Sequence, residues 1–316
     1  MKKKSKLELW IASFAIALIY VAVAILEQTV DSNHIIFTVL KKGAIYSLVA
    51  VSMNLLNGFT GLFSLGQAGF MLIGAYTYAI FTMPVEVKMT EQVYKYYASA
   101  IHFDTGIFVG LICAGLAAAL FAALIGLPVL RLKSDYLAIA TIGFAEIIRA
   151  IFQWDVLGPV TNGANVMREY LDLTDVKIPF TDIPFPPTLY VFLAAGVCIA
   201  LIVLLINSSY GRAFKAIRDD EVAAEAMGIN LFKHKEMSFV ISSFFAGVSG
   251  ALLAMYQYTV QAAQFKSAMT YEILLIVVIG GIGSISGSCI ASFLYIAASE
   301  WWLRGLDMGK FLGIEA

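Results

Sequence analysis

The residues of this chain that could do chemistry are polar or charged groups placed within apolar stretches. Glu146 and Arg149 are three positions apart, so on a helix they would share one face within reach of an ion pair. An ionisable residue inside a membrane segment is a candidate for a substrate pathway, although such a pair can also neutralise itself as a structural element. Hydroxyl and amide side chains beside glycines form a second set, in segments 57–74 and 280–287. Groups of these kinds can bind a polar solute without covalent chemistry.

The two glycine-rich segments fall at similar places in the two halves of the chain, each inside a long uncharged stretch. Paired hydrophobic segments interrupted by glycine are typical of broken helices around a substrate path at the membrane midplane. Close packing of helices through small residues is the alternative explanation. The residues that we expect to line a path are Gly61, Ser64, Gly66, Gln67, Glu146, Gly281, Gly283 and Ser284.

A long polar segment, 207–235, lies between two apolar runs. Within it, Ile217–Met227 is rich in Ala and Glu and is followed by Gly228, so the pattern predicts a short helix with a glycine C-terminal cap. A short, charged helix between two membrane spans is suited to contact with a cytoplasmic partner protein.

The composition places the chain among integral membrane proteins, because 60% of its residues are hydrophobic and only 14% are charged. Long uncharged stretches approach or exceed the roughly 20 residues that a helix needs to cross a bilayer. They are Leu9–Leu26, Gly43–Val85, Thr105–Leu130, Ile183–Gly211, Met237–Phe265 and Ile273–Ser299, with Tyr136–Trp154 as a weaker one. Since open strands leave their backbone unsatisfied in lipid, we expect an all-α polytopic protein with about 8–9 transmembrane helices. These would form a single transmembrane domain over 1–316.

The placement of Lys and Arg predicts that the N-terminus is cytoplasmic. Segments 1–6, 128–135 and 207–237 hold 11 of the 21 Lys and Arg residues, and cytoplasmic loops carry an excess of these residues. The acidic segment 155–188 then lies outside, as a connecting loop or as a docking surface for an extracytoplasmic partner. Its five prolines argue against a long helix.

Other motifs do not indicate an enzyme. The chain contains no GxxxxGK[ST] sequence, the loop that cradles ATP phosphates. Its cysteines lie in apolar stretches and its histidines are scattered, which indicates no metal site. Gly281 and Gly283 with Gly287 give the spacing GxGxxxG, which differs from the dinucleotide-binding GxGxxG. We therefore expect no cofactor bound by this chain.

Three sequences resemble the larger permease subunit of branched-chain amino-acid ABC importers. They are NGFTGLFSLGQAGFMLIGAYTYA at 57–79, GRAFKAIRDDEVAAEAMGINLFKHKEMSFVISSFFAGVSGALLA at 211–254 and GGIGSISG at 280–287. The resemblance covers about 41–299. It implies a type II-like importer permease fold in a bacterial inner membrane. Urea and short-amide permeases of the same superfamily share much of the pattern, so they remain the alternative.

The resemblance implies a subunit that imports leucine, isoleucine or valine by alternating access. Its partners would be a homologous second permease, two cytoplasmic ATPase subunits that use the ATP, and an extracytoplasmic substrate-binding protein. A stand-alone ion-coupled transporter is the alternative from another class, and the lack of a central unpaired acidic residue weighs against it.

The coupling motif of ABC importers aligns with Val222–Gly228, where Val222 replaces the usual leading Glu. Which acidic group meets the ATPase therefore stays open. The resemblance assigns ATPase coupling to Arg218, Glu221, Ala223, Ala224, Glu225 and Gly228. Members of the family usually have a further span and a basic tail beyond the point where this chain stops, so we expect that last span to be missing after 316.

Overall fold

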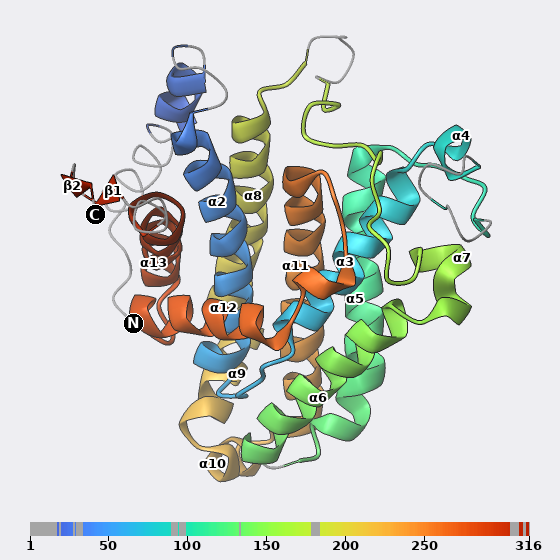
Figure 1. The fold of residues 1–316 in the computed structure, drawn as a ribbon. Helices are drawn as coiled ribbons and strands as arrows, with labels where there is room; N and C mark the ends of the chain where they lie inside the picture. The colour runs from blue at the N-terminus through green and yellow to red at the C-terminus, as the bar shows by residue number, and fades with distance from the viewer. Residues whose placement is uncertain are drawn as a thin grey trace.

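The fold consists of long helices whose axes are roughly aligned or oblique to one another. One further helix lies across them (Figure 1). The computed structural model describes residues 20–27, 34–89, 99–132, 134–177 and 184–303, together with residues 18, 29, 94, 310–311 and 314–315. The long helices are α2 (Ile35–Asn54), α3 (Gln67–Thr82), α5 (Ile107–Val129), α6 (Ser134–Phe152), α8 (Pro187–Asn207) and α11 (Leu231–Gln257). Helix α12 (Ser267–Gly280) crosses the bundle and leads into α13 (Ile285–Ala297).

Short elements connect these helices. They are η1 (Leu55–Phe59), α4 (Val85–Lys88), η2 (Asp155–Leu157), α7 (Gly158–Thr161), α9 (Ser209–Asp219), α10 (Glu221–Ala226), η3 (Ala262–Gln264) and η4 (Ala298–Trp302). Strand β1 (Lys310–Phe311) pairs antiparallel with β2 (Ile314–Glu315). Apart from this pairing and isolated bridges, the described residues are helical or irregular, so the predicted all-α class is confirmed for them.

Four of the described helices are long and apolar enough to cross a membrane: α2 with its continuation η1, α5, α8 and α11. A fifth candidate is a bent pair, Tyr136–Phe152 with Asp155–Thr161, whose parts meet at 61°. The chain is therefore a multi-pass membrane protein. Most of the predicted first span, Leu9–Leu26, lies outside the described residues.

Three predicted spans match helices well: Thr105–Leu130 contains α5, Ile183–Gly211 contains α8, and Met237–Phe265 overlaps α11, which begins earlier, at Leu231. The stretch Ile273–Ser299 is divided between α12 and α13. Gly281 and Gly283 separate the two helices with φ values of +92° and +84°, a backbone region that other residues rarely adopt. In the predicted outer loop, the described part 155–177 holds only the short η2 and α7, as its prolines predict.

Small and hydroxyl residues, rather than the most apolar ones, mark the centre of the bundle. In the most apolar 18-residue stretch of α11, 78% of the residues are buried. In the corresponding stretch of α8, only 22% are buried, although α8 is the more apolar helix. Lipid is as apolar as leucine, so helices in a membrane associate where small residues allow close approach. At the crossing of α3 and α11, a Cβ added to Gly74 would overlap the carbonyl group of Gly247.

We expect Gly74→Ala to destabilise the protein by about 1–3 kcal/mol, because an added methyl group at this crossing must push two helix backbones apart. Gly143→Ala in α6 is the matched control, since a Cβ at Gly143 meets no atom within 4 Å. Thermal unfolding of the purified proteins in detergent measures both variants. Equal unfolding temperatures for the two variants would contradict this account of the crossing.

Candidate coupling and translocation site

The first glycine-rich segment interrupts the helical structure between α2 and α3, and we call residues 55–66 the first break. Helix α2 passes into the π-helical turn η1, and residues 60–66 are irregular before α3 begins at Gln67. The side chain of Asn57 accepts a hydrogen bond from the N–H of Ser64 at 3.2 Å and donates one to its carbonyl oxygen at 3.3 Å. The hydroxyl group of Thr141 accepts from the N–H of Leu65 at 2.9 Å. Side chains therefore satisfy backbone groups that the break removes from a helix.

The second break, Gly281–Ser284, is held by the side chain of Asn54 at the end of α2. Its Oδ1 accepts from the N–H of Gly283 at 2.7 Å, and its Nδ2 donates to the carbonyl oxygen of Ser284 at 3.1 Å. Nδ2 also donates to Oγ of Ser288 at 2.8 Å. A Cβ added to Gly58 would lie 2.5 Å from the nitrogen of Gly283, so the two breaks are in direct contact.

Polar contacts also hold the start of α3. The side-chain amide of Gln67 donates to Oγ of Ser242 at 2.9 Å, and the N–H of Ala68 donates to Oγ1 of Thr270 in α12 at 3.2 Å. Ser64 and Gln67 are 1% and 2% exposed. Oε1 of Gln67 accepts no hydrogen bond from the residues that the structure describes. The N-terminal ends of α3 and α12 thus lie close together inside the protein.

Glu146 forms the ion pair that its spacing predicts, with 2.7 Å between its Oε2 and Nε of Arg149. It also accepts hydrogen bonds from the N–H of Ser267 at 3.2 Å and from its hydroxyl group at 2.5 Å. Ser267 is the first residue of α12. The carboxylate therefore lies at the N-terminal end of α12, where the helix dipole favours negative charge.

The predicted path residues thus differ in exposure. Ser64, Gly66 and Gln67 are buried, Gly61 is exposed, and Glu146, Gly281, Gly283 and Ser284 are half-buried. The sequence analysis did not single out the side chains that satisfy the breaks, Asn54, Thr141 and Thr270. The signal that could have found them is a lone polar residue within an apolar helix, because such a residue needs a partner inside the membrane.

The polar segment 207–235 forms two helices rather than the predicted single helix over Ile217–Met227. The chain leaves α9 at Asp220, which has extended backbone with φ −161° and ψ 111°. Its carboxylate accepts from the N–H groups of Val222 and Ala223 at 2.9 and 3.0 Å and so caps α10. Asp is among the best helix N-caps, and its side chain competes with the helix for these N–H groups, which explains the break.

The glycine cap predicted at Gly228 is confirmed. Gly228 has φ +85°, and its N–H donates to the carbonyl oxygen of Glu225 at 2.9 Å. The N–H of Ile229 donates to the carbonyl oxygen of Ala224 at 3.1 Å, which completes a Schellman motif. A Cβ at Gly228 would meet nothing within 4 Å, so backbone conformation alone restricts this position.

Helix α10 presents an apolar surface to solvent. Val222 and Met227 are 78% and 84% exposed, whereas Ala224 is buried. Glu221 pairs with Lys235, with 2.7 Å between Oε2 and Nζ. Glu225 is exposed and has no ion pair among the side chains that the structure describes.

Arg218 connects helix α9 to both breaks. Its Nη1 donates to the carbonyl oxygen of Gly58 at 3.1 Å, and its Nη2 donates to Oδ1 of Asp219 at 2.8 Å. A Cβ added to Gly61 would lie 3.0 Å from Cγ of Arg218, and one added to Gly283 would lie 3.6 Å from Nη1. The guanidinium group of Arg218 thus donates both to the first break and to Asp219.

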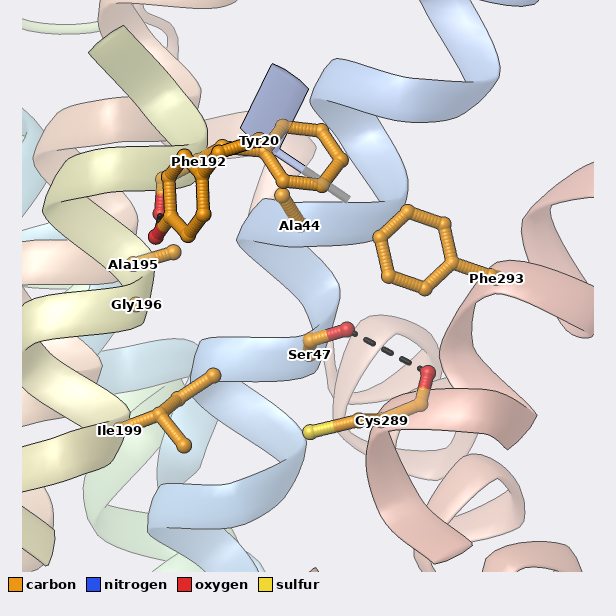
Figure 2. Close-up of a pocket in the computed structure, with 9 residues that line it drawn as sticks. All are labelled: Tyr20, Ala44, Ser47, Phe192, Ala195, Gly196, Ile199, Cys289 and Phe293. Atoms are coloured by element: carbon orange, nitrogen blue, oxygen red, sulfur yellow. Dashed lines mark hydrogen bonds between the residues drawn. The ribbon is translucent and has the colours of Figure 1, made fainter. Parts of the chain in front are cut away.

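A pocket between α2, α8 and α13 lies apart from these contacts (Figure 2). It has a volume of about 180 Å³, and Phe192, Ile199 and Phe293 form much of its apolar wall. The hydroxyl group of Ser47 is 3.5 Å from the carbonyl oxygen of Cys289, to which it donates (Figure 2). None of the predicted path residues lines this pocket.

Residues 35–312 match the protein family described as "Branched-chain amino acid transport system / permease component". The chain is 31% identical to the high-affinity branched-chain amino acid transport system permease protein LivM of Escherichia coli strain K12, over 91% of this chain and 67% of the relative. It thus spans about two thirds of the length of that relative, and 61% of a LivM protein from Salmonella typhimurium.

Two further relatives come from Methanocaldococcus jannaschii. The chain is 21% identical to its probable branched-chain amino acid transport permease protein LivM, over 80% of this chain and 76% of the relative. It is 24% identical to its probable LivH, over 87% of each. No solved structure matches the chain.

The family match covers the two breaks, helices α9 and α10 and the candidate spans around them. The chain therefore belongs to the permease components of branched-chain amino acid ABC transport systems, a family of membrane subunits and not of ATPases.

Proposed function

We propose that this permease moves leucine, isoleucine and valine into the cell by alternating access, with the energy supplied by ATP hydrolysis in separate subunits. The contact of Arg218 with the first break carries the proposal, because a force on α9 would reach the backbone at Gly58 directly. Gly58 touches Gly283, so both breaks would respond together. Access to the path would change through these two segments.

The partners that fit this proposal are two cytoplasmic ATPase subunits, a homologous second permease and an extracytoplasmic binding protein. Helix α10 offers the exposed Val222 and Met227 and the unpaired Glu225 to an ATPase groove. The similarity of this one chain to relatives named LivM and LivH supports pairing of two homologous permeases. The ATPase subunits would bind the ATP, and this chain no cofactor.

We place the protein in a bacterial inner membrane with its N-terminus in the cytoplasm. The shorter helices α3 and α13 and the apolar stretch near the N-terminus would bring the four or five candidate spans toward the expected 8–9, in a type II-like importer architecture, while α12 lies across the bundle. The chain 1–316 would form one permease domain, with the coupling segment 207–235 inside and the loop 155–188 outside.

The substrate path would run along the two breaks and the N-terminal ends of α3 and α12. Positive helix ends favour a substrate carboxylate. The lining residues would be Gly61, Ser64, Gly66, Gln67, Glu146, Gly281, Gly283 and Ser284. Ser64 and Gln67 are buried in this structure, so a substrate could reach them only after the breaks move. This requirement agrees with alternating access.

Reconstitution of the complete complex in vesicles tests the substrate. We expect ATP-dependent uptake of labelled leucine that unlabelled isoleucine and valine compete away, because an apolar pocket separates such side chains only weakly. Urea and acetamide serve as competitors in parallel. Uptake of urea without any response to leucine would replace this substrate with the short-amide class.

We expect Gly228→Pro to abolish substrate-stimulated ATP hydrolysis and uptake. Proline fixes φ near −65° and has no N–H, whereas Gly228 has φ +85° and donates to Glu225. Gly228→Asn is the control, because Asn tolerates the left-handed conformation of a helix cap. Co-purification with the ATPase subunits, ATPase rate and uptake are the measurements. Normal uptake by the Pro variant would contradict a coupling role for α10.

Arg218→Ala should uncouple the transporter, so that ATP is hydrolysed while uptake per ATP falls roughly tenfold or more. The estimate follows from the loss of a charge-assisted hydrogen bond, worth about 1.5–3 kcal/mol. Arg212→Ala is the control, because the Arg212 side chain is exposed on the same helix and donates its hydrogen bond to Ser209, away from both breaks. An unchanged ratio of uptake to ATP hydrolysis in the Arg218 variant would show that this contact transmits nothing.

A further inference from the structure

A second pocket lies beside helix α10, away from the pocket in Figure 2. It lies where the end of α5, α6, α10 and α11 meet, and its volume is about 380 Å³. Small-ligand sites range over roughly 300–1,000 Å³, so the pocket can hold a molecule of amino-acid size. Leu62, which directly follows Gly61, contributes to its wall. The pocket therefore touches both the first break and the coupling helix.

One side of the pocket is apolar. Leu62, Leu130 and Leu137 line it and are 4%, 5% and 1% exposed. Leu132 lines it as well and is 45% exposed. Leu132 exposes most of this apolar surface and the three buried leucines close the pocket behind it, which suits a small branched aliphatic group, since burial of such a group is favourable and non-directional.

The other side of the pocket carries charges of both signs. Arg131 lies with its guanidinium carbon 5.9 Å from the centre of the Phe232 ring, and no ion pair of Arg131 occurs among the described side chains. Glu221 and Lys235 pair across the pocket, and the side chain of Lys235 is only 14% exposed. Two positive groups and one carboxylate leave one positive charge in excess, which favours a ligand that carries a carboxylate.

We propose that this pocket binds a branched-chain amino acid from the cytoplasm and that the bound product slows further import. Its carboxylate pairs with Arg131, its ammonium group shares Glu221 with Lys235, and its side chain lies against the leucines. This inference rests on the proposed import function and on the cytoplasmic position of α10.

Product bound in this way connects α10 with the end of α5, and coupling requires these two elements to move relative to each other. Glu221 is the first residue of α10, and Arg131 lies just beyond the end of α5. A ligand that contacts both residues stabilises the arrangement in which they are close. A ligand that prefers one arrangement shifts the population toward it, so ATP hydrolysis would drive fewer cycles.

The test uses the complete complex in vesicles that are either empty or preloaded with unlabelled leucine. We expect internal leucine to lower the initial rate of ATP-driven uptake of labelled leucine, and internal glutamine at the same concentration to leave it unchanged. In Arg131→Gln, the internal leucine concentration that halves the rate should rise about tenfold or more, because a charge-assisted contact is lost. Uptake into empty vesicles should persist in this variant.

Lys233→Gln is the matched control. Lys233 is exposed near the start of α11, two residues from Lys235 and so on a different side of the helix, and it does not line the pocket. Loss of its charge should leave inhibition by internal leucine as in the wild type. Equal inhibition of the wild type and Arg131→Gln, or no inhibition of the wild type, would overturn the proposal.

Equilibrium dialysis of labelled leucine against the purified complex, without the binding protein, supplies a second measurement. We expect binding to the wild type that Arg131→Gln weakens about tenfold or more and Lys233→Gln preserves. Equal binding by wild type and Arg131→Gln would overturn the pocket assignment. A wild-type complex that imports no leucine into empty vesicles would instead contradict the proposed function, and dialysis would still decide whether the pocket binds it.

Discussion

The hydrogen bonds of the Asn54 side chain are the interaction on which the two halves of the site depend. Inside a bilayer no water can satisfy the backbone of a broken helix, and each unsatisfied group costs several kcal/mol. Asn54 provides both an acceptor and donors to the second break, at Gly283, Ser284 and Ser288. Because Asn54 ends α2, which leads into the first break, one side chain holds both breaks in contact.

The same requirement explains the other polar contacts of the core. Thr141 of α6 satisfies the first break, Thr270 of α12 satisfies the start of α3, and Glu146 of α6 lies at the start of α12. Each partner lies on a different helix from the group that it satisfies, so a movement of one break changes the hydrogen bonds of its neighbours. A bundle built in this way can respond as a unit to a force applied at α9.

The segment that forms α9 and α10 is tied to the rest of the protein at two points. Arg218 connects α9 with the carbonyl oxygen of Gly58, while Glu221 at the start of α10 pairs with Lys235 of α11. Helix α10 is thus fixed at one end and exposed along its apolar side. The pocket at Glu221 and Arg131 lies against this fixed end, and Leu62 of the first break also lines it.

The sequence by itself determined the features that depend on neighbouring residues. Apolar length indicated membrane helices, glycines located both breaks, Gly228 capped α10, and the spacing of Glu146 and Arg149 gave an ion pair. It also contained the N-cap residue Asp220, which divides the predicted helix Ile217–Met227 into α9 and α10. The sequence analysis missed this local signal. Only the tertiary structure decided that Asn54 meets Gly283, 229 positions away, and that Arg218 meets Gly58, 160 positions away. The apolar residues of a helix indicate that it is surrounded by lipid or by protein. They do not indicate which neighbouring helix will satisfy its polar groups.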